Sequence, residues 1–105
     1  RYIHVHVPCP LGWGTESDET ISVARLAVEC GLFPLYEAEY GDVTDRTTIR
    51  RKVPVDDYLK VQKRFAHLFK PKRDEMRLAL IQSIADRNIC RFGLMPARKA
   101  EEDMR

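Results

Sequence analysis

The sequence lacks several features that would assign it at once to a broad class. No apolar run in its 105 residues approaches the roughly 20 residues that a membrane-spanning helix needs. Its 18 basic and 16 acidic side chains leave a formal charge of +2, too weak a bias to predict binding to nucleic acid or to an anionic membrane. Charged residues make up 32% and hydrophobic residues 44%, which indicates one small globular domain rather than a disordered chain.

Cysteine is also scarce. Cys9, Cys30 and Cys90 are odd in number and widely spaced, and no CxxC motif is present. This pattern disfavours a disulfide framework, and it disfavours a zinc or iron–sulfur site built from this chain alone. Reduced thiols are the default, and we expect a cytoplasmic location. No signal peptide is visible, but Arg1 enters a strand pattern without an initiating Met, so we expect a cut or processed start.

The hydrophobic pattern predicts two strands and about three helices. Residues 2–7 and 34–40 read as strands, and the largely apolar helix expected over 17–30 between them completes a βαβ-like unit packed on most sides. Gly31 suits the left-handed end of that helix. Helices are expected over 54–69 and 72–88, the second with Leu78, Leu80, Ile81, Ile84, Ala85 and Ile89 facing inward.

These elements divide the chain into four parts. Residues 1–45 form the strand–helix–strand part, 46–53 an exposed loop with a short strand near 47–51, 54–92 a helical extension, and 93–105 a charged tail. Two strands alone make a poor sheet, and the first helix has more apolar surface than two strands cover. The chain is therefore expected to be an α/β piece that completes something larger.

The most specialised stretch is "HVPCPLGWG", residues 6–14. Prolines on both sides of Cys9 fix its backbone and keep it extended. Gly12 and Gly14 permit close backbone approach or positive φ, and Trp13 supplies a large flat ring. Such rigidity suits a preorganised ligand, although composition alone favours a buried thiol beside a hydrophobic plug.

Three blocks of the sequence carry a resemblance to a known family. "YIHVHVPCPLGWG", "TISVARLAVECGLFPLYEAEYG" and "VPVDDYLKVQKRFAHLF", in this order and spacing, resemble the C-terminal part of the thiamine diphosphate-binding beta subunit of 2-oxoacid:ferredoxin oxidoreductases, in the pyruvate branch. The resemblance covers about residues 2 to 69. It implies the end of a doubly wound α/β domain that binds thiamine diphosphate.

The resemblance implies one cofactor ligand. The cysteine of this block binds a [4Fe-4S] cluster in the family, which assigns that role to Cys9, while the other three ligands lie earlier in the subunit. The N–H groups of Leu11, Gly12 and Trp13 are expected to donate to cluster sulfur, and the Trp13 ring to exclude water. No catalytic residue maps here, and the Gly-Asp-Gly signature for diphosphate and Mg²⁺ is absent. Leu11 departs from a family position that is often Thr, which removes a hydroxyl.

The implied reaction is the CoA-dependent oxidative decarboxylation of a 2-oxoacid, with electrons passing through [4Fe-4S] clusters to ferredoxin in anaerobic metabolism. The implied partners are the rest of the beta subunit, alpha, gamma and delta subunits or their fused equivalents, ferredoxin, CoA and the 2-oxoacid. The segment alone is expected to be inactive. Two alternatives remain open: a non-catalytic cytosolic α/β interaction module, and a one-cysteine redox sensor at Cys9.

Other chemistry-bearing residues have plainer interpretations. His4 and His6 share a predicted strand face, which favours packing over a metal pair. The basic run from Arg50 to Lys52 is interpreted as a solvated loop, with docking of an acidic ferredoxin or of CoA phosphates as its alternative. Glu37 and Glu39 are interpreted as structural, Cys30 as core, His67 as solvent-facing, and Cys90 as partly exposed near a helix end.

Overall fold

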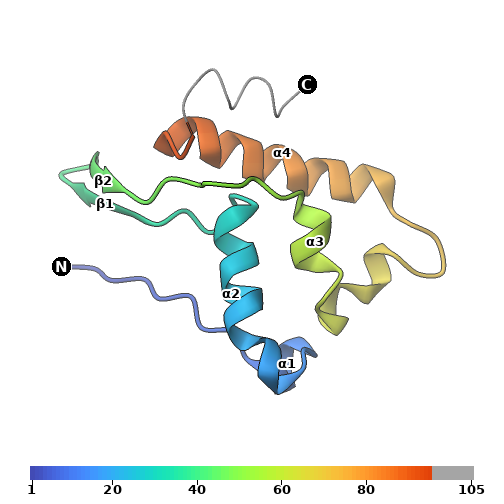
Figure 1. The fold of residues 1–105 in the computed structure, drawn as a ribbon. Helices are drawn as coiled ribbons and strands as arrows, with labels where there is room; N and C mark the ends of the chain where they lie inside the picture. Colours follow the sequence, from blue (N-terminus) through green and yellow to red (C-terminus); the bar gives the residue numbers. More distant parts are fainter. Residues whose placement is uncertain (96–105) are drawn as a thin grey trace.

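A computed structural model describes residues 1–95 (Figure 1). The elements follow an extended start in the order α1 (Pro10–Trp13), η1 (Ser17–Glu19), α2 (Thr20–Glu29), β1 (Tyr36–Glu39), β2 (Asp42–Arg46), α3 (Val55–Leu59), η2 (Lys63–Leu68) and α4 (Glu75–Phe92). The predicted α/β class is confirmed, with two antiparallel strands and several helices. Within these residues, every helix is too short or too polar to cross a membrane. Most of the predicted tail over 93–105 lies outside the described residues.

The core lies where α2, α3 and η2 meet α4, which runs across the ends of α2 and α3 (Figure 1). Its buried side chains come from every one of these helices and from the strand-to-helix loop: Val23, Ala27, Cys30, Val53, Val55, Tyr58, Leu59, Leu68, Leu78 and Ala85. Ile49, Ile89, Leu94 and Met95 form a second buried cluster beside it. The C-terminal helix therefore closes the core instead of extending away from it.

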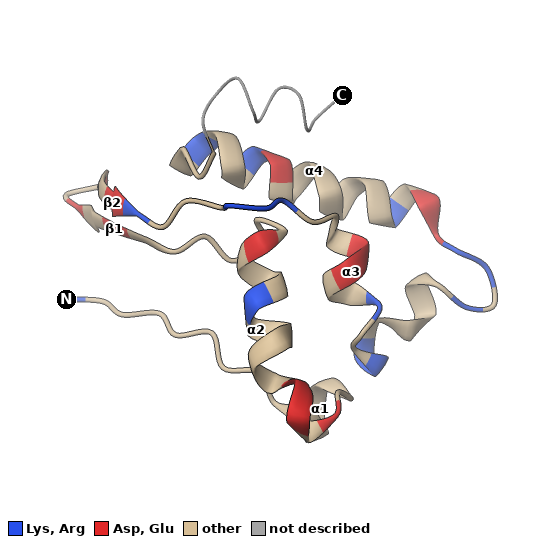
Figure 2. Cartoon of the chain, viewed as in Figure 1, with Lys and Arg blue, Asp and Glu red and all other residues tan. Residues whose placement is uncertain are grey.

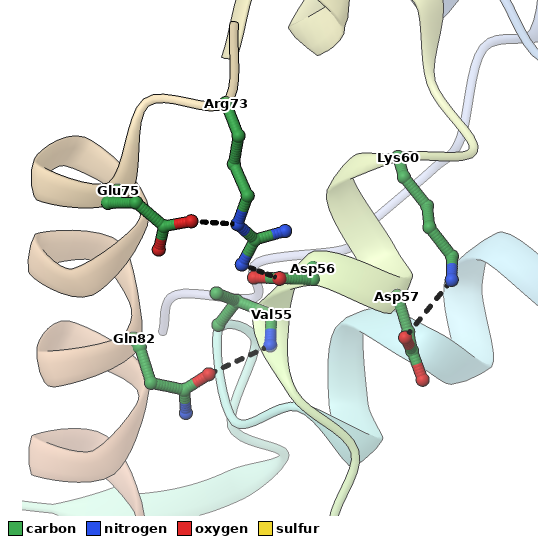
Figure 3. Close-up of polar contacts among 7 residues, drawn as sticks. All are labelled: Val55, Asp56, Asp57, Lys60, Arg73, Glu75 and Gln82. Atoms are coloured by element: carbon green, nitrogen blue, oxygen red, sulfur yellow. Dashed lines mark hydrogen bonds and ion pairs between the residues drawn. The ribbon is translucent and has the colours of Figure 1, made fainter. Parts of the chain in front are cut away.

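Polar contacts fix α3 against α4 (Figure 3). The backbone N–H of Val55 donates to the Gln82 side-chain oxygen at 3.0 Å, which satisfies an otherwise free group in the first turn of α3. Arg73 bridges the two helices by pairing with Asp56 on α3 and with Glu75 at the start of α4. These surface pairs add orientation more than stability.

The helix predicted over 17–30 is confirmed as η1 followed by α2. Gly31 follows it with φ +91°, the left-handed conformation expected there. A Cβ at Gly31 would lie 2.9 Å from Ile89 Cγ1 and 3.0 Å from the Ala85 carbonyl oxygen. Ile21 remains largely exposed, so the prediction that this helix is packed on most sides is wrong for the described chain.

The strand predictions are only partly correct. β1 lies within the predicted 34–40, but its partner is β2 at 42–46, and no strand forms at 2–7 or 47–51. Tyr40 and Gly41 have φ of 52° and 85°, a two-residue hairpin turn that makes the adjacent segment the nearest partner. Residues 2–7 are extended but do not form a strand. A strand needs a second strand to satisfy its backbone, and none pairs with residues 2–7 within residues 1–95.

The helix predicted over 54–69 is interrupted at Gln62. Gln62 adopts an extended conformation, with φ −114° and ψ 119°, and separates α3 from η2. Its side chain is buried, at 1% exposure, and its Nε2 donates to the Tyr58 carbonyl oxygen at 2.8 Å. A side chain that bonds the local backbone competes with helix continuation, and that competition separates the two short helices.

The third predicted helix is confirmed but shifted toward the C-terminus. The Asp74 carboxylate accepts from the Arg77 N–H at 3.0 Å at its start, and Gly93 ends it with φ +61°. Leu78, Ala85 and Ile89 are buried as predicted, but Leu80 and Ile84 point outward. Helix α4 thus carries more apolar surface than the core of residues 1–95 buries.

Candidate functional site

Cys9 lies at the turn where the extended start becomes helical. Its backbone is extended, with φ −114° and ψ 100°, as the following proline requires. Pro10 opens α1 at the position where a missing N–H costs least, and the Trp13 N–H donates to the Cys9 carbonyl oxygen at 2.8 Å. Pro8 is buried while Cys9 is exposed. The loop thus anchors its backbone and presents the thiol outward.

The surroundings of the Cys9 sulfur are open. A Cβ at Gly12 would lie 3.3 Å from Cys9 Sγ, so the bare glycine leaves space on that side of the sulfur. Leu11 is 96% exposed. Within residues 1–95 the N–H groups of Leu11 and Gly12 have no acceptor, whereas that of Trp13 is used inside the turn. Two amides of the predicted three therefore remain available to a group bound at the sulfur.

The far end of the loop is clamped by η2. Gly14 has φ +72°, and its carbonyl oxygen accepts from the Lys63 N–H at 3.1 Å. A Cβ at Gly14 would lie only 2.5 Å from Lys63 Cβ, so glycine is required by conformation and by space. This close approach ties a loop near the N-terminus to a segment about 50 residues later.

Trp13 is held between two side chains. The Arg64 guanidinium carbon lies 3.9 Å from the centre of its ring, a cation–π stack, and the His6 ring centre lies 5.3 Å away. Arg64 Nε also donates to the buried Gln62 Oε1 at 2.8 Å. Gln62 and Arg64 were not predicted as part of this site, because two polar residues in an amphipathic pattern indicate a solvated helix face.

His4 and His6 both lie against the Phe33 ring, but only His6 is partly buried, so the packing expected of both residues holds for His6 and not for the exposed His4. The Phe33 ring centre lies 5.3 Å from that of His4 and 4.7 Å from that of His6. Burial, and secondarily the charges of Arg64 and His4, lowers the pKa of His6. His6 Nε2 is buried without a partner among the described residues.

The remaining candidates do not gather around Cys9. Cys30 is buried in the core, and burial raises its pKa to about 11, which confirms a structural thiol. Cys90 is exposed on α4, and Glu37, Glu39 and His67 are exposed. Lys52 is not solvated as predicted for its run, since its Nζ lies 2.9 Å from Asp86 Oδ1 and the side chain is nearly buried.

Residues 1–95 hold no group of three or more His, Cys, Asp or Glu side chains that could bind a metal ion. An exposed thiol with a glycine-made space and two free amides nevertheless fits one corner of an iron–sulfur cluster. The other ligands of such a cluster would have to come from polypeptide outside these residues. The arrangement fits a contributed ligand and does not fit a self-contained metal site.

Sequence comparisons with known proteins agree on one group. The chain is 46% identical over 93 residues to pyruvate synthase subunit PorB of Methanosarcina barkeri, a match that covers 89% of this chain and 31% of the relative. It is 46% identical over 91 residues to PorB of Methanothermobacter marburgensis, covering 85% of this chain and 29% of that protein. Ketoisovalerate oxidoreductase subunit VorB of Pyrococcus abyssi is 39% identical over 71 residues, 66% of this chain and 23% of the relative.

The chain spans about a quarter to a third of the length of these relatives, and no protein-family model matches it. Nearly the whole chain aligns at close to half identity with subunits of one name, a level at which the fold and its core are shared. The chain therefore belongs to the beta subunits of the pyruvate synthase family, of which it corresponds to a C-terminal segment.

Proposed function

We propose that this chain is part of a 2-oxoacid:ferredoxin oxidoreductase that carries out the CoA-dependent oxidative decarboxylation of a 2-oxoacid, with pyruvate as the substrate. The observation that carries the proposal is the 46% identity, over most of the chain, to subunits named pyruvate synthase. The relative named ketoisovalerate oxidoreductase acts on another 2-oxoacid, which supports the same reaction class. The partners would be the rest of the beta subunit, the other subunits, and ferredoxin as electron acceptor.

In this proposal Cys9 supplies one ligand of a [4Fe-4S] cluster. The thiol is exposed, and its backbone is fixed by the flanking prolines. The backbone N–H groups of Leu11 and Gly12, at the start of α1, have no acceptor among residues 1–95. When bound, such a cluster accepts and passes single electrons. Thiamine diphosphate and Mg²⁺ would be bound mainly by polypeptide outside this chain, since the Gly-Asp-Gly signature of the family is absent from the sequence.

The surrounding residues would act on the cluster through the protein matrix. Trp13, held by Arg64 and packed against the core, covers one side of the loop and limits water there. The two free amides are the hydrogen-bond donors that tune the potential of a cluster sulfur. The clamp between Gly14 and Lys63 keeps the sulfur in one place while electrons arrive and leave. A fixed ligand keeps the structural change on reduction small.

The test is the iron content of the complete enzyme, purified without oxygen, after Cys9→Ala. The variant is expected to lose the iron of one cluster and the corresponding EPR signal. Cys9→Ser, which keeps a weaker oxygen ligand, is expected to retain part of the iron with an altered signal, and it guards against a failure of Cys9→Ala to assemble. The matched control is Cys90→Ala, another exposed cysteine, which should retain all iron.

An unchanged iron content and EPR signal in assembled Cys9→Ala would remove the cluster role from this chain. The 2-oxoacid is tested separately by comparing the oxidation rates of pyruvate and 3-methyl-2-oxobutanoate by the purified enzyme with ferredoxin as acceptor. Faster turnover of pyruvate is expected. The absence of any CoA-dependent 2-oxoacid oxidation would overturn the proposed reaction.

A further inference from the structure

The outward face of α4 is apolar in its first half. Met76, Leu80 and Ile84 recur every four residues, so they form one stripe about 12 Å long, and they are 73%, 60% and 44% exposed. On the opposite side of the same helix, Leu78, Ala85 and Ile89 fill the core. A helix that is apolar on two faces is packed on two sides in a stable protein.

The second half of this face is cationic. Arg87 and Arg91 continue the same line at spacings of three and four, and both are exposed without an acidic partner among residues 1–95. The two acidic residues of α4 are engaged elsewhere: Glu75 pairs with Arg73, and Asp86 pairs with Lys52. Figure 2 shows the basic positions toward the C-terminal end of α4. The face therefore combines an apolar stripe with a purely positive end.

This charge pattern argues against parallel pairing with a second copy of the chain. A parallel arrangement would place Arg87 against Arg87 and Arg91 against Arg91. Like charges facing one another across an interface disfavour association, whereas an acidic partner would neutralise them.

The position of α4 indicates which polypeptide lies there. Apolar side chains are exposed on the extended residues 2–7 beside the Cys9 loop, on the outward face of α4 and around the β1–β2 hairpin. The Cys9 loop and α1 lie at one end of α2, whereas α4 crosses its other end (Figure 1). The remainder of the beta subunit is needed beside the Cys9 loop, where residues 2–7 lack a backbone partner, which leaves the face of α4 for another chain.

We infer that the outward face of α4 docks an amphipathic acidic helix of another subunit, its apolar stripe against Met76, Leu80 and Ile84 and its carboxylates against Arg87 and Arg91. This is a helix-against-helix contact in which the stripe provides the buried area and the arginines set the orientation. The inference rests on the proposed function only in that the partner is sought in the multi-subunit enzyme.

The experiment uses the complete enzyme with two readouts. The first is the alkylation rate of Cys90, which is exposed on the edge of this face, measured by peptide mass spectrometry in the assembled enzyme and in the separated beta subunit. Alkylation is expected to be at least ~10-fold slower in the assembled enzyme, because a docked helix covers the thiol. The second is the amount of partner subunit that co-purifies with the beta subunit.

The double variant Arg87→Glu/Arg91→Glu is expected to weaken subunit association by ~10-fold or more and to reverse its salt dependence. The matched control Arg25→Glu/Arg51→Glu makes the same charge change at exposed positions on α2 and in the loop before α3, and should assemble normally. Leu80→Asp, at a side chain that is 60% exposed, is a second variant with the same expected loss. Iron per beta subunit should stay unchanged in all of them, so the cluster proposal is tested apart from this one.

Three results would overturn the inference. One is equal alkylation of Cys90 in the assembled and separated subunit together with normal assembly of Arg87→Glu/Arg91→Glu. Another is protection that disappears when residues 96–105 are deleted from an otherwise intact complex, since the occupant would then be the chain's own C-terminus. The third is a beta subunit that dimerises alone through this face, measured by sedimentation and abolished by the double variant.

Discussion

Cys9 and Cys30 lie in two regions where a glycine packs closely against another part of the chain, yet the two regions treat sulfur in opposite ways. Around Cys9, two prolines and the turn of α1 hold the backbone while the thiol stays exposed. Around Cys30, the end of α2 turns the thiol into the core, where its Sγ donates weakly to the Ala27 carbonyl oxygen at 3.5 Å. The backbone, and not the residue type, decides which cysteine is available for chemistry.

The two regions also differ in what stabilises them. The surroundings of Cys30 are apolar and depend on close contact between the turn after α2 and α4, where Gly31 lies against Ile89. The Cys9 loop depends on polar and aromatic contacts with η2, through Gly14, Lys63, Trp13 and Arg64. The first region should therefore respond strongly to changes in volume, and the second to changes in hydrogen bonding and charge.

The largest expected difference between the two regions is in thiol reactivity. In beta subunit stripped of iron, Cys9 should be alkylated readily because it is exposed, whereas Cys30 should react at least ~100-fold more slowly. Burial raises the pKa of Cys30 to about 11, so few thiolates form near pH 8, and the packed core excludes the reagent. Site-resolved mass spectrometry of the alkylated peptides over time provides the rates. Similar rates at Cys9 and Cys30 would show that the comparison is wrong.

Gly31→Ala tests the packed region. The new Cβ would meet Ile89 Cγ1 at 2.9 Å and the Ala85 carbonyl oxygen at 3.0 Å, in a residue with φ +91°. The strained φ and the overpacking together should destabilise the contact between Gly31 and α4 by about 3 kcal/mol. Hydrogen exchange of peptides from α2 and α4, measured by mass spectrometry in the complete enzyme, reports this loss locally.

Gly41→Ala is the matched control for that substitution. Gly41 also has a positive φ, +85°, but nothing lies within 4 Å of the position where its Cβ would be. It should therefore show only the cost of the strained φ, about 1 kcal/mol, confined to the hairpin. If the two substitutions had equal effects, the contact between Gly31 and α4 would contribute nothing to stability.

The helices were predictable from the sequence because a helix satisfies its own backbone. The end of α2 before Gly31 and the inward positions Leu78, Ala85 and Ile89 follow from glycine and spacing. The start of α2 does not follow from capping, since the helix begins at Thr20 without a side-chain cap. The strand predicted at 2–7 does not form, because a strand cannot satisfy its own backbone. Its alternation is clear, but the strands that would pair with it are not among residues 1–95, and β1 instead paired with the segment after its turn.

The conformation of the Cys9 loop was predictable only in part. The extended backbone at Cys9 and the positive φ of Gly14 follow from proline and glycine, but the helical turn Pro10–Trp13 was not predicted. The contacts of Gln62 and Arg64 with the Trp13 side of the loop could not be predicted, because they depend on segments about 50 residues apart. The break in the predicted helix at Gln62 accompanies the contact of Arg64 with Trp13.

The smallest expected effect concerns His6, at the edge of the Cys9 loop. Burial first, then the charges of Arg64 and His4, lowers its pKa in the folded protein below the value of 6.5 that it has in an unfolded chain. The fold therefore favours the neutral ring, so its full contribution to stability is present above pH 6.5 and is lost as the pH falls below 6.5 toward the lower folded pKa.

His6→Phe keeps an aromatic ring against Trp13 and Phe33 but removes the titration. Hydrogen exchange in the peptides around α1, corrected for the intrinsic pH dependence and compared between pH 8 and pH 5, should show more opening at low pH in the wild type than in the variant. An identical pH response in both proteins would mean that the ring of His6 titrates as it does in water and that the aromatic cluster does not enclose it.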